Sequence, residues 1–524
     1  MLMLPTAQGL PPDILRELFE HLAIVDPAGW CIRSHAYSMG LGWITATHVC
    51  RRWREIGSDM TTLWAYSVCA FPNISVADEL LRRARNCLLN IQVSHFVHRS
   101  SLGQHRPHLP ISWGAQQLHR AHTFDCHIYR WSTFADDHPG AYAALTDPLP
   151  DLQHITLISS YLDKLHPFPT VVLRAPALIS ANLRGILLHP TSIASKLRKL
   201  SLTSGSEGAG ADLSPVLDSL RSLKCLEHLN MTFDTHGTMP VANCSVVHLE
   251  HLRTLHALCS TVQQASDVLE FISAPHIRWL SVTISSILSN EQIFAKAGVH
   301  WQQLQKSPNS RCTLSVSKSH LYLHDEIPEL TALELSWHAP NGLLWVNYTS
   351  IVSALPRVLD FSRFICLELS CSKDGHQCDE LDAALAVFRD ASTRVEVLTL
   401  YNTPHPSTLR MLLASDGDSP LPVPALKTLC FGAEHWEHGQ SGRSRLVHGG
   451  GTATMWWDTV KDVLGIRSQK GAPINRLFLA GDWCTQEAWT EEWTTQSEEC
   501  LTRGLVSEVV DIRERISECD LCDS

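Results

Sequence analysis

The chain has 524 residues, more than one compact hydrophobic core normally contains, so we expect several structural units or one extended array. An apolar content of 44% with 18% charged residues is typical of a globular protein and argues against wholesale disorder. The formal net charge of −11 argues against nucleic acid or an anionic membrane as the main partner, because both select basic surfaces.

Residues 1–13 have neither a basic start nor a long apolar run, so the sequence predicts no secretory signal. We also find no apolar stretch long enough for a membrane span, which needs roughly 18 or more residues. Without an export signal, the 17 cysteines are expected to be reduced thiols. We therefore expect a cytoplasmic protein, a nuclear protein or both.

Two amphipathic helices are predicted near the N-terminus. Residues 10–22, LPPDILRELFEHL, place their apolar side chains on one helical stripe, and two prolines precede an acidic residue where a helix would begin. A second helix is predicted from Ile44, with Val49 and Trp53 on one face. A unit of this size is too small to bury both stripes by itself, so another part of the chain or a partner protein must cover the apolar surface that is left exposed.

These residues carry a resemblance to a known family. In order, LPPDIL at 10–15, HVCRRWR at 48–54 and LW at 63–64 resemble the F-box, in particular the large F-box families of mushroom-forming fungi. The resemblance covers roughly residues 8–68 of a module assigned to residues 1–68, with an insertion at about 23–42 that is longer than the usual connection in the family. That insertion could loop out or interfere with docking. The alternative is an ordinary three-helix start of a globular domain.

The resemblance implies that this module docks a Skp-family adaptor, which links F-box proteins to a cullin scaffold and a ubiquitin-conjugating enzyme. By motif position, the residues that would face the adaptor or support that face are Leu10, Pro11, Ile14, Leu15, Leu18, Val49 and Trp53. Three neighbours could equally form the core of the module itself: Phe19, Leu22 and Cys50.

Residues 69–148 are interpreted as a transition region with one helix, which runs into a strand over 77–93. From 149 to 486 a six-position pattern, apolar-x-x-apolar-x-apolar, recurs. It starts eleven times, at residues 152, 178, 197, 226, 252, 277, 330, 364, 395, 426 and 474. The two long gaps, after 277 and after 426, could each hold a degenerate repeat or an insertion. Each pattern predicts a short strand with one inward face, which a single repeat cannot bury alone.

The recurrence resembles an irregular leucine-rich-repeat domain. Regular members of that family carry Asn or Cys three positions after each strand, whereas none of the eleven corresponding positions here does. We therefore expect a solenoid of uneven curvature. The alternative is a doubly wound α/β domain, in which strands and helices also alternate.

We find no sequence motif for catalysis, cofactor binding or metal binding. The phosphate-binding, nucleophile-elbow and HExxH motifs are absent, and Cys519 and Cys522 form a lone CxxC without a second ligand pair. The 29 histidines are spread over the whole chain, as expected of a compositional feature.

Six of the 16 tryptophans follow residue 430, where they could cap a solenoid or line a recognition surface. Residues 487–524 carry 11 acidic and three basic residues and are interpreted as an acidic tail.

The sequence thus predicts an α/β protein with a small helical F-box module and an irregular leucine-rich-repeat-like solenoid. The expected function is substrate recognition in a Skp–cullin–F-box ubiquitin ligase, without catalysis by this chain, and its target protein is not encoded in recognisable form. One alternative is a non-catalytic binding scaffold with no role in ubiquitination. A second is an enzyme with an unfamiliar site around residues 434–457.

Overall fold

The computed structural model describes residues 10–33, 36–94, 98–99, 105–106, 108–160, 169–203, 214–233, 245–284, 296–297, 312–316, 320–325, 332–337, 359, 361, 364–370, 394–401, 406–415, 419–432, 453–480, 482–484 and 489–516. Internal contacts divide the chain into two compact units. Unit 1 comprises Met1–Leu255 with Phe271–Ala274, and unit 2 comprises His256–Glu270 with Pro275–Ser524.

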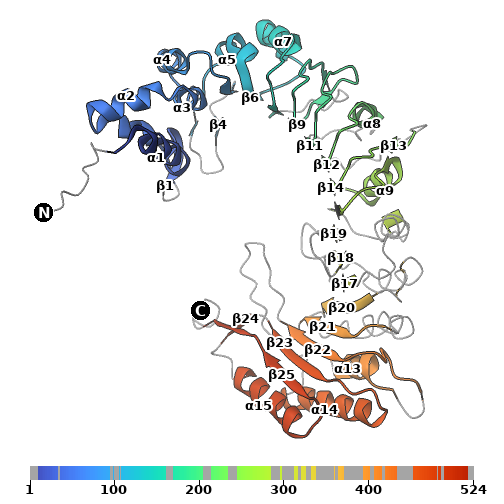
Figure 1. The fold of residues 1–524 in the computed structure, drawn as a ribbon. Coiled ribbons are helices and arrows are strands. Elements are labelled where there is room, and N and C mark those ends of the chain that lie inside the picture. The colour runs from blue at the N-terminus through green and yellow to red at the C-terminus, as the bar shows by residue number, and fades with distance from the viewer. Residues whose placement is uncertain are drawn as a thin grey trace, which may run out of the picture. The chain divides into compact units, whose positions relative to one another are not determined.

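Unit 1 begins with a group of short helices (Figure 1). Helix α1 (Pro12–Val25) starts with a proline in its first turn, where a missing N–H breaks no intrahelical bond, and Asp13 lies at the positive end of its dipole. The segment predicted as an insertion contains an antiparallel hairpin of β1 (Gly29–Arg33) and β2 (Ala36–Gly40). A 3₁₀ helix, η2 (Gly42–His48), then leads into α2 (Arg51–Asp59), α3 (Thr61–Tyr66) and α4 (Ile74–Ala84).

Helix α4 follows as the sequence predicts and runs into a strand. The Asn73 side chain caps it by accepting hydrogen bonds from the backbone N–H groups of Ser75 and Val76. Strand β3 (Leu89–Ser94) comes next. Where the sequence indicates one helix in the transition region, the structure has α4 and four further short helices: α5 (Ile111–Gln117), η3 (Leu118–Arg120), α6 (Phe134–Asp137) and α7 (Pro139–Thr146). Helices of three to eight residues are too short for a clear apolar period.

The chain has an α/β fold with a large parallel sheet. In unit 1, neighbouring strands follow the order of the sequence and all pair in parallel: β3, β6 (Ala121–Ile128), β7 (His154–Ser159), β9 (Ser180–Arg184), β11 (Lys199–Thr203) and β12 (His228–Phe233). The boundary between the units falls within β14 (Thr254–Cys259). Outside the sheet lie α8 (Ser214–Arg221) and the short paired strands β4 (His98–Arg99), β5 (His105–Arg106), β8 (Thr170–Val171), β10 (Leu187–Leu188), β13 (Val247–His248) and β15 (Ile272–Ser273).

The sheet of unit 2 is mostly parallel but contains an antiparallel insertion. Its order is β16 (Trp279–Ile284), β19 (Ala332–Trp337), β18 (His320–Asp325), β17 (Cys312–Val316), β20 (Phe364–Ser370), β21 (Val397–Tyr401), β22 (Thr428–Gly432), β23 (Arg476–Ala480) and β25 (Glu508–Asp511). Strand β18 runs antiparallel to both its neighbours, and the other recorded pairs are parallel. The hairpin of β17 and β18 lies in the first long gap of the sequence pattern.

Helices and a strand pair complete unit 2. They are α9 (Val262–Phe271), α13 (Pro406–Leu413), α14 (Ala453–Gln469), α15 (Trp489–Thr502) and the parallel pair of β24 (Asp482–Cys484) and β26 (Glu514–Ile516). Part of the segment interpreted as an acidic tail is therefore folded, because it contributes α15 and strand β25, which pairs with β23.

Each of the eleven six-residue patterns overlaps a strand of the large sheet, which confirms the predicted strands. One pair of backbone hydrogen bonds recurs at the start of several of these strands. Ile179 and Ser180 both donate their N–H groups to the carbonyl of Gln153, and Arg198 and Lys199 repeat this toward the carbonyl of Ile179. Further along, the same paired contact is accepted by the carbonyls of Arg198, Glu227, Glu396, Lys427 and Asn475.

Candidate docking surface of the N-terminal module

The N-terminal module is built around a cluster of aromatic side chains. Phe19 of α1 is fully buried, and its ring meets Trp43 of η2 at 6.1 Å and Trp53 of α2 at 5.9 Å between centroids. Trp43 in turn lies 4.6 Å from the ring of Trp64 in α3. Aromatic rings bury large apolar areas, so four short elements obtain one shared core that none could form alone.

The two central indoles also satisfy their polar atoms. Trp43 Nε1 donates to Ser67 Oγ at 3.2 Å, and Trp64 Nε1 donates to the backbone carbonyl of Gly57 at 2.9 Å. Buried N–H groups without partners are costly, so these hydrogen bonds fix the rotamers of both rings. The core is therefore specific in geometry as well as apolar.

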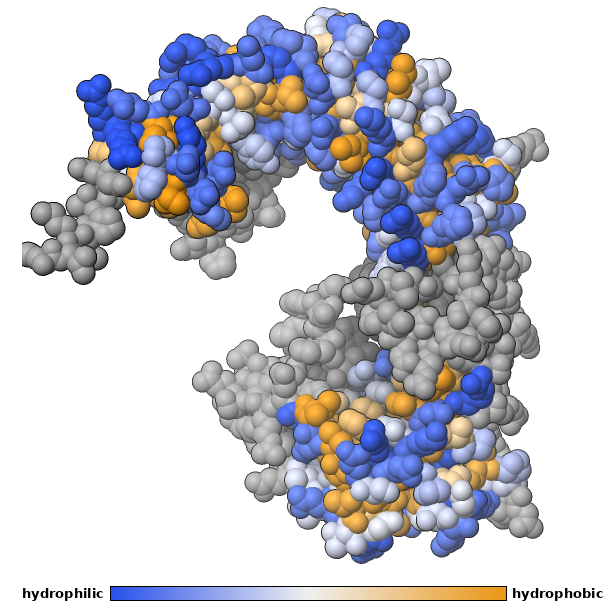
Figure 2. Space-filling view, viewed as in Figure 1, coloured by the Kyte–Doolittle hydropathy of each residue, from blue (hydrophilic) through white to orange (hydrophobic). Residues whose placement is uncertain are grey.

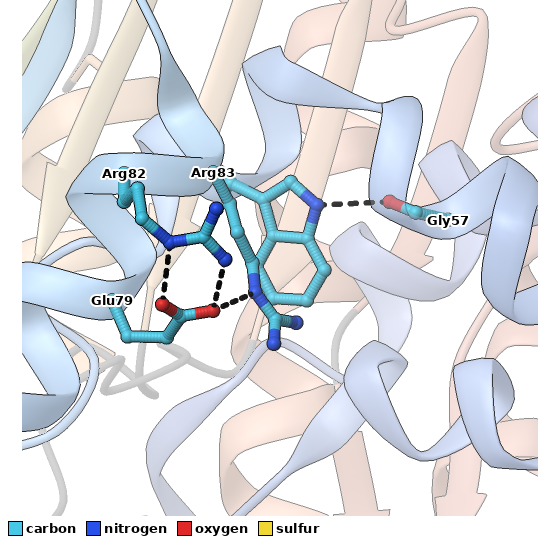
Figure 3. Close-up of polar contacts among 5 residues, drawn as sticks. Gly57, Glu79, Arg82 and Arg83 are labelled. Atoms are coloured by element: carbon cyan, nitrogen blue, oxygen red, sulfur yellow. Dashed lines mark hydrogen bonds and ion pairs between the residues drawn. The ribbon is translucent and has the colours of Figure 1, made fainter.

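A charged layer covers the outer side of this core. The Arg83 guanidinium lies 4.7 Å from the centroid of the Trp64 ring, a favourable cation–π distance. Figure 3 shows the Glu79 carboxylate between the guanidinium groups of Arg82 and Arg83, with oxygen–nitrogen distances of 2.7 to 2.8 Å. The hydrogen bonds from Arg82 and Arg83 lower the pKa of Glu79 to about 2. Helix α4 is thereby tied to α3 across the indole.

The predicted partner-binding residues divide into three groups. Leu15 and Trp53 are core residues, with exposures of 0% and 7%. Pro11, Ile14 and Val49 are exposed, the last two at 46% and 58%. Leu10 and Leu18 are half-buried. Of the three residues that could equally form the core, Phe19 does belong to it, and Leu22 and Cys50 are half-buried.

Further exposed apolar side chains lie on the same module. Together with Pro11, Ile14 and Val49 they form what we term the exposed apolar set, completed by Ile24, Val25, Met39, Leu41 and Tyr66. Val25 is 82% exposed and Tyr66 75% exposed. Helix α1 packs against both η2 and α2, and Figure 2 shows apolar residues gathered around α1 on the face in view. Exposed apolar groups at this density are typical of a protein-binding surface.

The hairpin insertion leaves the module and returns to it at almost the same place. The Trp43 N–H donates to the Asp26 carbonyl at 2.8 Å, which joins the end of α1 to the start of η2. Gly42 has φ +55, and a Cβ there would lie 2.4 Å from the backbone of Asp26 and Pro27. Only glycine fits this approach, so the chain re-enters the module directly beside the point where it left.

Trp43, Met39 and Leu41 were missed by sequence reasoning. Trp43 lies in a run, LGWITATHVC, whose apolar period was visible, but nothing in the run distinguishes a core indole from a surface one. Met39 and Leu41 belong to an insertion that has no place in the family motif.

Three tryptophans of unit 2 form a second aromatic cluster. Trp456 and Trp457 of α14 and Trp493 of α15 are buried, and their rings approach Phe431 of β22 at 4.8, 6.4 and 5.8 Å. These three therefore serve packing between helices and sheet. Trp436 lies outside the described residues.

Within the described residues, no group of three or more His, Cys, Asp or Glu side chains is arranged to hold a metal ion. None of the helices described is both long and apolar enough to cross a membrane. Cys519, Cys522 and residues 433–452, which include most of the alternative enzyme site, lie outside the part of the chain that the structure describes. No protein-family model matches this chain, and no curated protein sequence matches it.

Proposed function

We propose that this chain is the substrate-recognition subunit of a Skp–cullin–F-box type ubiquitin ligase. One observation carries the proposal: the motif residues separate into a buried aromatic core and an exposed apolar group. Leu15 and Trp53 support the module from inside, while Ile14 and Val49 remain available to a partner. Large apolar side chains exposed together on one small module are typical of a protein-docking surface.

The sheet supports the second half of the proposal, a repeat domain that holds a target protein. Parallel strands that follow the order of the sequence apart from β17–β19, joined by the same paired backbone contact, are what an irregular leucine-rich-repeat-like solenoid requires. The antiparallel pair β17 and β18 accounts for part of the irregularity. Such an array offers a long strand-lined face on which a protein can lie.

On this proposal the chain performs no covalent chemistry. The N-terminal module binds the Skp-family adaptor and the repeat domain binds the target, so the target is kept near the conjugating enzyme. Tethering raises the effective concentration of a reactive lysine, which is how a non-catalytic subunit accelerates transfer.

Co-purification of the full chain with a Skp-family adaptor tests the proposal. The double variant Ile14→Asp with Val49→Asp is expected to bind at least about tenfold more weakly, because a docked interface would bury two unpaired carboxylates. Both positions are exposed, so the core remains intact. Replacing Leu15 or Trp53 would be less informative, because their loss would unfold the module.

Ile193→Asp is the matched control, since Ile193 is 52% exposed and lies outside the N-terminal module. It should bind like the wild type. Equal binding by the double variant, or no adaptor binding by the wild type, would contradict the proposal. Ubiquitin transfer in a ligase reconstituted with this chain then separates the ligase subunit from a scaffold without a ubiquitination role.

A further inference from the structure

One row of side chains crosses the sheet of unit 1 on the face opposite the apolar core. In the strand register, Thr123 of β6 pairs with His154 of β7, which pairs with Ser180 of β9. The row continues to Lys199 of β11 and His228 of β12. None of these residues is buried, whereas the next residue along each strand is apolar and buried: Phe124, Ile155, Ala181, Leu200 and Leu229.

His122 joins this row through an irregularity in β6. The register with β3 shifts between Leu89 and Asn90, and His122 is the extra residue on the β6 side. Bulges of this kind redirect a side chain. The His122 ring consequently meets the His154 ring edge-on, at 5.8 Å between centroids. We term His122, His154, Lys199 and His228 the histidine–lysine row.

The histidine–lysine row contains no carboxylate. Within the described residues, the Lys199 ammonium has no ion pair, and His228 Nδ1 lies 3.0 Å from the Thr254 hydroxyl. Nearby carboxylates are engaged elsewhere: Asp125 of β6 pairs with His127 at 3.1 Å, and Glu227 pairs with Arg198 at 3.8 Å. A row of one lysine and three protonatable histidines, on a chain of net charge −11, is an arrangement that favours anionic groups.

We infer that the histidine–lysine row binds an extended acidic polypeptide segment, through its carboxylates, and binds it more tightly as the pH falls. This inference rests on the proposed function, because it takes this sheet face as the one that holds the target. Strands lie about 4.8 Å apart, so the row from β6 to β12 spans roughly 19 Å. An extended segment of about six residues covers that length, with about three side chains facing the row.

The neighbouring groups give the expected pH dependence its sign. Partial desolvation lowers the pKa of His154, and the nearby charges of His122 and Lys199 lower it further. His154 is therefore mainly neutral near pH 7, and a bound carboxylate favours its protonated form. Other charged groups on these strands are Asp125, His127 and Arg184, of which Arg184 also favours an anion. Proton uptake on binding makes affinity rise as pH falls toward the histidine range.

A polypeptide fits this face better than a nucleic acid. Only Lys199 in the row is charged at every physiological pH, and nucleic acids bind through many permanent cations. Ser180 lies within the row and carries a hydroxyl group, and Asn182 and Ser201, two residues further along β9 and β11, add an amide and a second hydroxyl. Such groups hydrogen-bond the backbone and side chains of an extended segment.

Fluorescence anisotropy of the full chain with a labelled ten-residue peptide of alternating Glu and Ser tests the inference. We expect binding about tenfold tighter at pH 6.0 than at pH 7.5, as proton uptake by one histidine allows. Lys199→Gln should weaken binding at least about fivefold at both pH values. His154→Asn with His228→Asn should abolish most of the pH dependence.

Two matched controls accompany the measurement. Lys224→Gln removes the same charge from the turn between α8 and β12, outside the row, and should leave binding unchanged. A peptide of alternating Gln and Ser should not bind. Equal binding of the Gln and Glu peptides, equal losses for Lys199→Gln and Lys224→Gln, or tighter binding of a labelled oligothymidylate of equal length would overturn the inference.

Adaptor capture on the same preparations separates this inference from the proposed function. Adaptor capture without Glu-peptide binding overturns the inference alone. Glu-peptide binding without adaptor capture overturns the ligase function and supports the row as a binding surface. Should the double histidine variant fold poorly, the exposed Lys199 still decides the outcome through Lys199→Gln.

Discussion

At the scale of single residues, Gly57 shows how closely the N-terminal elements approach one another. A Cβ at this position would lie 2.8 Å from Thr47 Cγ2 and 3.1 Å from Phe19 Cζ. The same residue accepts the hydrogen bond of the Trp64 indole through its carbonyl. Helix α2 can therefore contact both α1 and η2 only because this residue has no side chain.

Gly57→Ala should destabilise the N-terminal module by about 1–3 kcal/mol, because the added methyl group overpacks a filled core. Urea unfolding followed by tryptophan fluorescence measures the change. Gly140→Ala is the matched control, since a Cβ in α7 meets nothing within 4 Å. That change should be neutral or slightly stabilising, because alanine restricts the unfolded chain. Equal effects of the two substitutions would refute the packing argument.

At this scale the sequence shows which residues are apolar, but it does not predict which of them are buried and which are exposed. Leu15 and Ile14 are adjacent in one amphipathic helix, yet the first is buried and the second is 46% exposed. Val49 and Trp53 differ in the same way. Neighbouring apolar residues on a helix point in different directions, and the partner elements decide which direction is inside. Those elements, η2 among them, come from elsewhere in the chain.

At the scale of elements, the edge strand β25 completes the sheet of unit 2. It pairs in parallel with β23 over Glu508–Asp511. Just beyond it, the buried Arg513 side chain pairs with Asp511 at 2.5 Å and donates to the Thr494 hydroxyl of α15 at 2.7 Å. The strand is thus held by its ladder and by one arginine that ties it to the helix.

Truncation after Gly504 should expose the edge of β23, and we expect a lower thermal midpoint and a tendency to self-associate. Differential scanning calorimetry and light scattering measure the two effects. Truncation after Ile516 is the control, because it leaves β25 and Arg513 in place. If both truncations melt and associate alike, β25 does not protect the sheet.

The sequence predicts the elements of the sheet well where one pattern repeats. Eleven strands follow from a single six-residue signature, because each needs the same inward-facing apolar positions. The β17–β18 hairpin was not predicted, although CTLSV and HLYLHD alternate as strands do, since Arg311 and Lys318 stand where the signature needs its first apolar residue. Strand β25 was hidden in a segment whose dominant local feature is acidity.

At the scale of the whole molecule, the sequence predicts the α/β class and the separation of a helical N-terminus from a strand-rich remainder. It could not predict the histidine–lysine row. His122, His154, Lys199 and His228 lie far apart in the chain and meet only through the strand register and one bulge. Among 29 histidines, nothing in the sequence marks these three.

The central claim is that the exposed apolar set of the N-terminal module docks a Skp-family adaptor. Amide hydrogen exchange of the full chain, with and without saturating adaptor, tests it most directly because it maps the contact without any substitution. We predict new protection in α1 and across the junction of η2 and α2, around Val49. Unchanged exchange there, or protection confined to unit 2, would contradict the account.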